Sequence, residues 1–247
     1  MNKLAFKLEY EAVNITSNGG IPVIIVAAGN STRMGGKNKQ FTRLCGVPTI
    51  VHTMLAFERC SAISNIIVVT KREDINAIEE LCLNYQISKL SDLVQGGDTR
   101  QQSVLNGLKV VKNAEHVLIH DGARPLVSCE IIERVCESLG KADGVICGVP
   151  IVDTLKRTDD KGFISKTIDR TNMISVQTPQ AVRVKEYTEL LSKCELAAFT
   201  DDASVLEMGG MSVAWVMGDK SNIKITTPDD IALAEFYLER RGKNECE

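Results

Sequence analysis

Short, unbroken apolar runs alternate along this chain with stretches in which apolar residues recur at helical spacing. An unbroken aliphatic run is typical of a parallel strand, because both faces of such a strand are buried. Helical spacing places the apolar side chains on one face of a helix. The predicted strands are 23–28, 65–70, 116–120 and 144–152, and the predicted helices are 47–60, 73–84, 102–111 and 128–139. We therefore expect an α/β fold with a doubly wound, mostly parallel sheet.

Residues 153–170 break this alternation, because they show no helical stripe. Residues 159–162 read Asp-Asp-Lys-Gly, a turn signal between two stretches that can pair as a β-hairpin. The hairpin is too polar to join a core, so we expect it to project as an arm and to meet a second subunit. The elements predicted after the arm are a helix capped by residues 200–204, short strands at 213–217 and 222–226, and a closing helix from about Pro228 to Arg241.

The chain of 247 residues is long enough to bury a large core in one domain. We expect this single domain to cover residues 21–241, with the arm at about 153–170 and a short tail at 242–247. Residues 1–20 lack the apolar segment of a signal peptide and contain glutamates, which disfavours a targeting signal. We interpret them as an N-terminal extension and expect them to be disordered.

A loop of small and basic residues follows the first predicted strand. Gly29 opens it, and Arg33 and Lys39 follow. Backbone N–H groups of such a loop can surround phosphate oxygens while the cations neutralise them. The glycine spacing of a dinucleotide-binding loop and the Ser or Thr that ends a Walker A loop are both missing. An ordinary strand-to-helix turn is the alternative, but the two cations favour binding of a nucleoside triphosphate.

Three polar segments directly follow predicted strands: the Gly29 loop, the turn at Asp121 and the residues after Pro150. The carboxyl ends of parallel strands meet at the edge where open α/β sheets bind ligands. We therefore expect these segments to form one site. Lys224 lies within an otherwise apolar stretch, where an unpaired ammonium group would be costly, so we expect it to have an anionic partner.

The composition disfavours several other classes of protein. A formal net charge of −3 argues against a general nucleic-acid-binding protein. No apolar run approaches the ~18 residues of a membrane-spanning helix, so we expect no membrane partner. The eight cysteines are irregularly spaced and contain no C-x-x-C pair. This pattern favours reduced, mostly buried thiols in a cytoplasmic protein over a zinc site or a disulfide framework.

Seven motifs occur in order between about residues 21 and 241. They read A-A-G-x-x-x-R-M-G with K-Q-F, G-G-D-T-R-Q-Q-S, H-D-G-A-R-P, D-T-L-K, D-R-x-x-x-x-x-x-Q-T-P-Q, T-D-D-A-S and N-I-K-I-T-x-P-D-D. Together they resemble the 2-C-methyl-D-erythritol 4-phosphate cytidylyltransferases, a family of Rossmann-like nucleotidyltransferases in the non-mevalonate isoprenoid pathway. The resemblance implies an enzyme that transfers the cytidylyl group of CTP to methylerythritol phosphate and releases pyrophosphate. The substrate phosphate would attack the α-phosphorus of CTP in line, so charge neutralisation and positioning matter more than a strong base.

The resemblance also implies how CTP is bound. Arg33 and Lys39 would hold the triphosphate and stabilise the transition state. The further residues implied to bind CTP are Ala27, Ala28, Gly29, Gly97, Asp98 and Ser103, the last three around the cytosine. Mg²⁺ is the implied cofactor, held mostly by the CTP phosphates with Asp121 as its one protein ligand.

The acceptor would be bound by residues from the second half of the chain. Arg170 and Lys224 are implied to orient its phosphate and to act in catalysis. The other residues implied to bind the acceptor are Asp121, Arg124, Thr154 and Thr200. The family forms homodimers in which each arm completes the neighbouring site, which gives the polar hairpin before Arg170 a purpose.

The phosphate-binding lysine and the function each have alternatives. Asn38 stands where the family usually has proline, and the gap between Arg33 and Lys39 is short, so Lys37 competes with Lys39 for the phosphate role. A ribitol-5-phosphate cytidylyltransferase, which shares the fold and CTP, is one alternative function. A non-catalytic nucleotide-binding regulator is another, although such a protein need not keep acceptor residues such as Arg170. We expect all three histidines of the chain to be scaffold residues.

Overall fold

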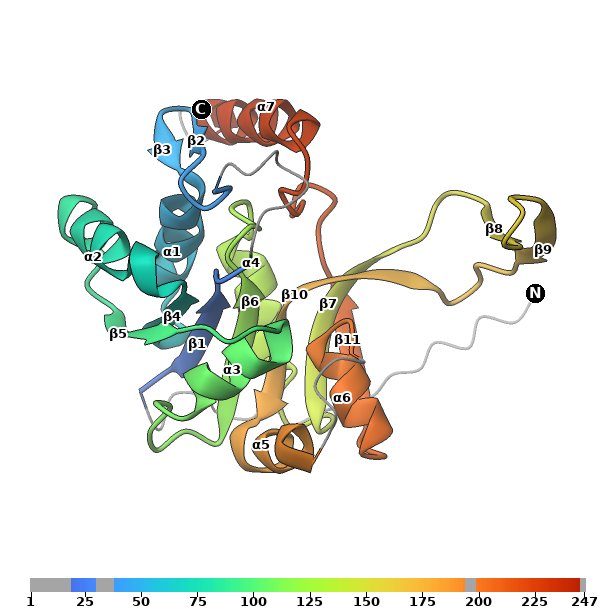
Figure 1. The fold of residues 1–247 in the computed structure, drawn as a ribbon, viewed down its shortest axis with the longest axis horizontal. Helices are drawn as coiled ribbons and strands as arrows, with labels where there is room; N and C mark the ends of the chain where they lie inside the picture. Colours follow the sequence, from blue (N-terminus) through green and yellow to red (C-terminus); the bar gives the residue numbers. More distant parts are fainter. Residues whose placement is uncertain (1–18, 30–37, 194–198, 245–247) are drawn as a thin grey trace.

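A seven-stranded sheet forms the centre of the computed structural model, which describes residues 19–29, 38–193 and 199–244. The strand order is β11-β7-β10-β6-β1-β4-β5, and every strand except β10 runs in the same direction. Their bounds are Ile21–Val26 (β1), Ile63–Thr70 (β4), Leu90–Gln95 (β5), His116–Asp121 (β6), Gly144–Pro150 (β7), Ile174–Arg183 (β10) and Val213–Met217 (β11). The predicted doubly wound, mostly parallel sheet is confirmed (Figure 1).

Helices cover both faces of the sheet, as Figure 1 shows. Side chains of β1 alternate between the two faces: Val23 and Ile25 pack on the side of α1 and α4, and Ile24 packs on the side of α3. All three are fully buried, which is why the sequence there is unbroken apolar. The helices are Thr49–Arg59 (α1), Ile75–Asn84 (α2), Arg100–Leu108 (α3), Cys129–Glu137 (α4), Val184–Lys193 (α5), Asp202–Met208 (α6) and Asp229–Asn244 (α7), with a 3₁₀ turn at Arg72–Asp74 before α2.

A third, smaller core lies beyond the carboxyl edge of the sheet. Ala234 of α7 packs there with Leu126, Ile225 and Leu44. Leu44 belongs to a short antiparallel pair, β2 (Arg43–Leu44) and β3 (Val47–Pro48). This core fixes the chain around residue 224 against the turn that follows β6.

The predicted hairpin forms β8 (Leu155–Thr158) and β9 (Ile164–Ile168), which pair antiparallel. Gly162 closes the turn at φ +85°, a conformation that glycine adopts without strain. In Figure 1 the arm extends well away from the sheet. Its Phe163 and Ile164 are 70% and 64% exposed, so the arm presents apolar side chains to solvent in a single chain.

The predicted strand at residues 222–226 is wrong. These residues pair with no described strand; instead the Ile225 N–H donates to the carbonyl of Ala123 at 2.8 Å. Strands β5 and β10 and helix α5 were not anticipated. The extension at 1–18 lies outside the described residues, so our expectation for it stays a prediction. Within the described ranges, no helix is both long and apolar enough to cross a membrane.

Candidate active site

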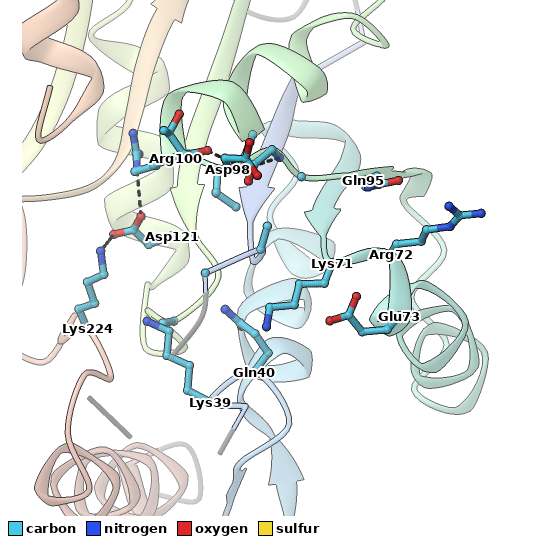
Figure 2. A pocket seen from close by; sticks show the side chains of 18 residues that line it. Lys39, Gln40, Lys71, Arg72, Glu73, Gln95, Asp98, Arg100, Asp121 and Lys224 are labelled. Atoms are coloured by element: carbon cyan, nitrogen blue, oxygen red, sulfur yellow. Dashed lines mark hydrogen bonds and ion pairs between the residues drawn. The ribbon is translucent and has the colours of Figure 1, made fainter. Parts of the chain in front are cut away.

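A cavity of about 480 Å³ opens at the carboxyl ends of the central strands (Figure 2). Chain order along the sheet reverses between β1 and β6, and ligands of open α/β sheets bind outside such a reversal point. The lining residues include the carboxyl ends of β1 and β6 and the loop before α3. They are Val26, Ala28, Gly29, Lys39, Gln40, Lys71, Arg72, Glu73, Gln95, Gly96, Gly97, Asp98, Thr99, Arg100, Ser103, Asp121, Ala123 and Lys224.

This cavity is positively charged although the chain as a whole is negative. Five of its lining residues are Lys or Arg and three are Asp or Glu, whereas the formal net charge of the chain is −3. Lys71 and Arg72 belong to the basic set and were not predicted; they directly follow β4, so their position at a strand end was the available signal. A local basic excess at the edge of an acidic protein favours an anionic ligand.

The predicted phosphate loop borders the cavity in part. Ala28 and Gly29 line it, whereas Ala27 is buried behind it and donates its N–H to the carbonyl of Val69 at 2.7 Å. Lys39 also lines the cavity, as Figure 2 shows. Arg33 and the competing Lys37 lie outside the described residues, so the choice between the two lysines stays open.

Gly96 and Gly97, in the loop before α3, lie where the surrounding atoms leave no room for a side chain. A Cβ on Gly96 would lie 2.3 Å from the Cβ of Ala28, and one on Gly97 would lie 2.1 Å from Cγ of Gln102. Ser103 fixes the backbone of this loop. Its hydroxyl accepts the Gly97 N–H at 3.1 Å and donates to the carbonyl of Thr99 at 2.9 Å. The predicted Gly97, Asp98 and Ser103 therefore line one wall of the cavity, with the backbone fixed by Ser103.

Asp121 is the central carboxylate of the site. It contacts three cations: Lys224 Nζ at 2.8 Å, Arg100 Nε at 3.5 Å and Arg124 Nε at 3.6 Å. Burial alone would raise the pKa of Asp121, but the three cations outweigh burial and hold this pKa well below its ordinary value. Asp121 is therefore ionised, and it is the anionic partner that we expected for Lys224.

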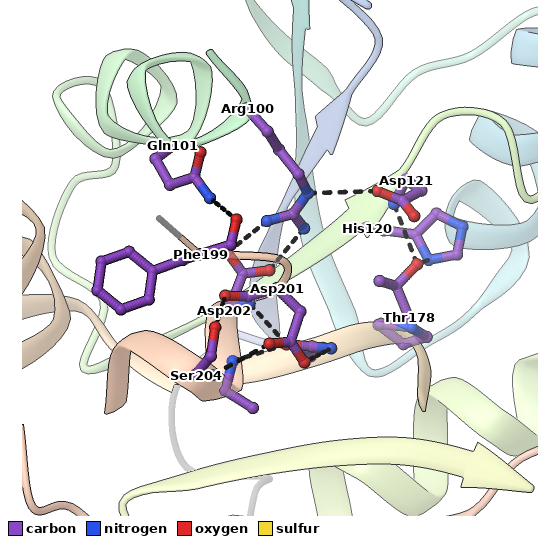
Figure 3. Close-up of polar contacts among 12 residues, drawn as sticks. Arg100, Gln101, His120, Asp121, Thr178, Phe199, Asp201, Asp202 and Ser204 are labelled. Carbon is purple, nitrogen blue, oxygen red and sulfur yellow. Dashed lines mark hydrogen bonds and ion pairs between the residues drawn. The ribbon is translucent and has the colours of Figure 1, made fainter. Parts of the chain in front are cut away.

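Arg100 is anchored more firmly than any sequence pattern indicated (Figure 3). Its Nη1 and Nη2 donate to the two carboxylate oxygens of Asp202 at 2.8 and 2.6 Å. Asp202 is fully buried and also accepts the hydroxyl proton of Tyr187 at 2.6 Å. Burial and the adjacent Asp202 raise the pKa of Tyr187, so this hydroxyl stays protonated and donates. The Asp202 carboxylate thus fixes the guanidinium group beside Asp121.

His120 has the scaffold role predicted for it. Its Nε2 lies 3.1 Å from the carbonyl of Arg124, which can only accept, so Nε2 carries the proton. Its Nδ1 then accepts the hydroxyl proton of Thr178, whose oxygen accepts the Asp121 N–H at 3.1 Å. Burial lowers the pKa of His120 to about 3, so the ring is neutral. This chain of bonds fixes the backbone that carries the Asp121 carboxylate.

A second cavity of about 260 Å³ adjoins the first and shares Arg100, Asp121 and Lys224 with it. The predicted Arg124 and Thr200 line the second cavity. Gln180, which was not predicted, also lines it; its side-chain oxygen accepts the N–H groups of Asp202 and Ala203, which start α6. Two binding spaces therefore meet at three shared charged residues.

Two predicted acceptor residues lie elsewhere. Thr154 and Arg170 are exposed at the base of the arm and line neither cavity. The Arg170 guanidinium donates to the carbonyl of Val152 within the same segment. A single chain does not bring these two residues to the site.

The residues around Asp121 show how the predicted Mg²⁺ could be bound. Three cations already surround this carboxylate, and among the described residues no group of three Asp, Glu, His or Cys ligands includes it. The residues thus do not fit an ion held by the protein alone. They fit an ion held mainly by phosphate oxygens, with Asp121 as a single further ligand.

The fold and the site together define a nucleotidyltransferase-like protein: a glycine loop and a basic cavity lie at the reversal point of a parallel sheet. Comparison with known proteins makes this more specific. The model of the family "2-C-methyl-D-erythritol 4-phosphate cytidylyltransferase" matches residues 21–240. The chain belongs to this family.

Relatives and solved structures agree with the assignment. Proteins named 2-C-methyl-D-erythritol 4-phosphate cytidylyltransferase from Bacillus licheniformis and Clostridium acetobutylicum are each 42% identical to this chain, over 90% and 89% of it and 97% of their own lengths. The structure of 4-diphosphocytidyl-2C-methyl-D-erythritol synthase from Anaerococcus prevotii matches with a TM-score of 0.79 at 32% identity, covering 90% of this chain and 96% of that one.

Proposed function

We propose that this chain transfers the cytidylyl group of CTP to 2-C-methyl-D-erythritol 4-phosphate, with release of pyrophosphate and formation of 4-diphosphocytidyl-2-C-methyl-D-erythritol. The observation that carries this proposal is that two cavities, of about 480 and 260 Å³, share Arg100, Asp121 and Lys224. An acceptor phosphate in the smaller cavity would lie next to the phosphates of a nucleotide in the larger one. Membership of the family supports this division.

CTP occupies the larger cavity in this proposal. The backbone of Ala28 and Gly29 and the cations Arg33 and Lys39 hold its triphosphate. The backbone around Gly97 reads the cytosine, and Ser103 supports that backbone rather than contacting the base, because its hydroxyl already bonds Gly97 and Thr99. Backbone donors and acceptors with fixed positions can distinguish an exocyclic amine from a carbonyl.

The acceptor phosphate lies near Lys224, Arg124 and Thr200. An ammonium group has three donors, and Asp121 takes one of those of Lys224 at 2.8 Å, so the others can bind phosphate oxygens while the carboxylate holds the group in place. A phosphate oxygen of the acceptor forms the new bond to the α-phosphorus as the bond to pyrophosphate breaks. No residue needs to remove a proton, so fixed positive charge is the main contribution of the protein.

We infer that Mg²⁺ enters with the nucleotide, since the carboxylate at residue 121 does not form a complete metal site. When bound to the phosphates, the ion would neutralise part of their charge. Removal of the metal with EDTA is expected to abolish turnover, and added Mg²⁺ to restore it.

We also propose a homodimer in which Arg170 and Thr154 of each arm complete the neighbour's acceptor site. Both residues are exposed and lie away from the cavities of their own chain. The exposed Phe163 and Ile164 on the arm supply apolar surface for such a contact.

We place the protein in the cytoplasm. The cysteines in the described part of the chain are free, and Cys45 among them is exposed. A reducing compartment preserves such a thiol, whereas an oxidising one promotes its pairing.

The test of the reaction is pyrophosphate release from CTP and Mg²⁺ with methylerythritol phosphate, with ribitol 5-phosphate in parallel. We expect turnover with methylerythritol phosphate. Equal or faster turnover of ribitol 5-phosphate would overturn the choice of acceptor. If neither acceptor releases pyrophosphate while CTP still binds, the chain is a nucleotide-binding regulator instead.

The test of the dimer mixes two inactive variants, Arg170→Ala and Lys224→Ala. If each site takes Lys224 from one chain and Arg170 from the other, a mixed dimer contains one intact site and one doubly altered site. Random exchange should then restore roughly one quarter of the wild-type activity. Mixing without any recovery would show that both residues act within one chain.

A further inference from the structure

A second cluster of reactive side chains lies between α1 and α4, and its residues line neither cavity of the proposed active site. Cys60 directly follows α1, and Cys129 and Glu133 lie one turn apart on α4. The two sulfur atoms and a carboxylate oxygen of Glu133 all lie within 4.8 Å of one another. Among the described residues, this is the one group of three His, Cys, Asp or Glu whose ligand atoms converge in this way.

The spacing matches the requirements of a tetrahedral metal ion. Zinc binds sulfur at about 2.3 Å and carboxylate oxygen at about 2.0 Å, which separates neighbouring sulfur and oxygen ligands by about 3.5 Å. The Sγ of Cys129 lies 3.6 Å from Oε1 of Glu133. Two residues four apart on a helix share one face, so a small adjustment of rotamers can direct both at one ion.

The charge balance of the cluster also favours a cation. No described Lys, Arg or His forms an ion pair with Glu133. A divalent ion bound here would displace the thiol protons and place positive charge beside a carboxylate that has no cationic partner among the described residues.

Access to the cluster is available from solvent. Glu133 and Cys136 line a cavity of about 450 Å³ near the amino-terminal ends of the strands. Cys136 lies one turn beyond Glu133 on the same helix face and is buried. Of the three side chains of the cluster, Glu133 borders this cavity, so an ion held by its carboxylate can take water from the cavity as a fourth ligand.

We propose that Cys60, Cys129 and Glu133 form a binding site for a thiophilic divalent metal ion of the zinc type. The ion would join the end of α1 to the start of α4, two helices that contact each other on the same face of the sheet. The site is separate from the magnesium carried by the nucleotide and uses sulfur ligands, which Mg²⁺ does not favour. Its role is to stabilise the fold by binding the native state only.

The test uses full-length protein in which Cys45, Cys194 and Cys246 are replaced by serine, so that these thiols do not bind metal. The protein is stripped with a chelator under reducing conditions and titrated with Co²⁺. We expect one equivalent to bind with the absorption of a thiolate-to-cobalt transition, and Zn²⁺ to displace it. Cys129→Ser should weaken binding by about 100-fold or more, and Glu133→Gln should weaken it less.

Cys147→Ser is the matched control, because Cys147 is a buried cysteine outside the cluster. It should bind Co²⁺ as the parent does, and circular dichroism checks that each variant is folded. Equal Co²⁺ affinity in the Cys129→Ser variant and the parent would overturn the proposal, as would a titration without the thiolate absorption. A Cys60–Cys129 disulfide that survives treatment with a reductant would overturn it too, because it leaves no thiolates to bind the ion.

Discussion

Replacement of Asp202 by asparagine should be the most damaging change near the site that leaves every cavity-lining residue intact. The carboxylate is fully buried and accepts two bonds from Arg100, at 2.8 and 2.6 Å, and one from Tyr187. Asparagine keeps the size but removes the charge, so the Arg100 guanidinium is left with Asp121 at 3.5 Å as its carboxylate partner. Loss of one partner of a buried ion pair costs about 3–5 kcal/mol.

The effect should be visible in both stability and rate. A loss of about 3–5 kcal/mol corresponds to roughly 6–20 °C in the melting temperature of a domain of this size. Arg100 should also turn toward Asp121 and compete with Lys224 for it, since both already contact this carboxylate. A displacement of about 1 Å in a positioned group can lower kcat by about 100-fold.

Tyr187→Phe is the matched control for Asp202→Asn, because it removes one hydrogen bond to the same carboxylate and leaves the pair with Arg100. We expect it to cost about 1.5–3 kcal/mol, the range for one hydrogen bond to a charged group. Urea unfolding of both variants gives the comparison, with pyrophosphate release as the second measurement. If Asp202→Asn loses no more stability than Tyr187→Phe, the Arg100–Asp202 pair does not anchor the site and the reasoning is refuted.

Lys224→Ala should lower kcat/KM for the acceptor by about 100- to 1,000-fold, because one fixed cation at the acceptor phosphate is lost. CTP affinity should stay largely unchanged, because Arg33 and Lys39 are the cations proposed to hold the triphosphate. A matching loss of CTP affinity would contradict this. His120 should make stability depend on pH. Its pKa is about 3 when folded, against about 6.5 when unfolded, so stability is complete above pH 6.5 and falls as the pH drops, by about 2 kcal/mol at pH 5. His120→Gln should remove this dependence of stability on pH, which unfolding measured at pH 5 and above pH 6.5 would show. Gly96→Ala should cost about 1–3 kcal/mol and weaken CTP binding, because the new Cβ would lie 2.3 Å from that of Ala28; calorimetric binding at wild-type strength would show that the loop adapts.

Local sequence patterns were sufficient where both faces of a strand are apolar, as in β1, or where a turn signal stands alone, as in the arm. They failed at β10, because Gln177, Thr178 and Gln180 interrupt its apolar pattern although all three are buried. Their polar groups are satisfied by partners distant in sequence, such as Asn222 and Asp202. Burial of a polar residue depends on those partners, which no local pattern contains.

The same limit applies to the site. The positions of Gly97, Asp98 and Asp121 followed from strand ends and motifs, and each lines the cavity. The anchoring of Arg100 by Asp202 joins residues 102 positions apart, so no local pattern could indicate it. The convergence of Cys60 with Cys129 was missed for the same reason, because the spacing along the chain gave no sign of it.

The charges around Asp121 also explain why a single carboxylate lies in a site for anions. Arg100 is balanced by Asp202, so Lys224 and Arg124 remain against one carboxylate, and the group keeps a positive charge. Without Asp121 these cations would repel one another in a partly buried space, and Lys224 would have no fixed position. With Asp121 they are held together, yet not neutralised. The carboxylate therefore arranges the cations in advance, and the positive charge that remains is available to the phosphates of the two substrates.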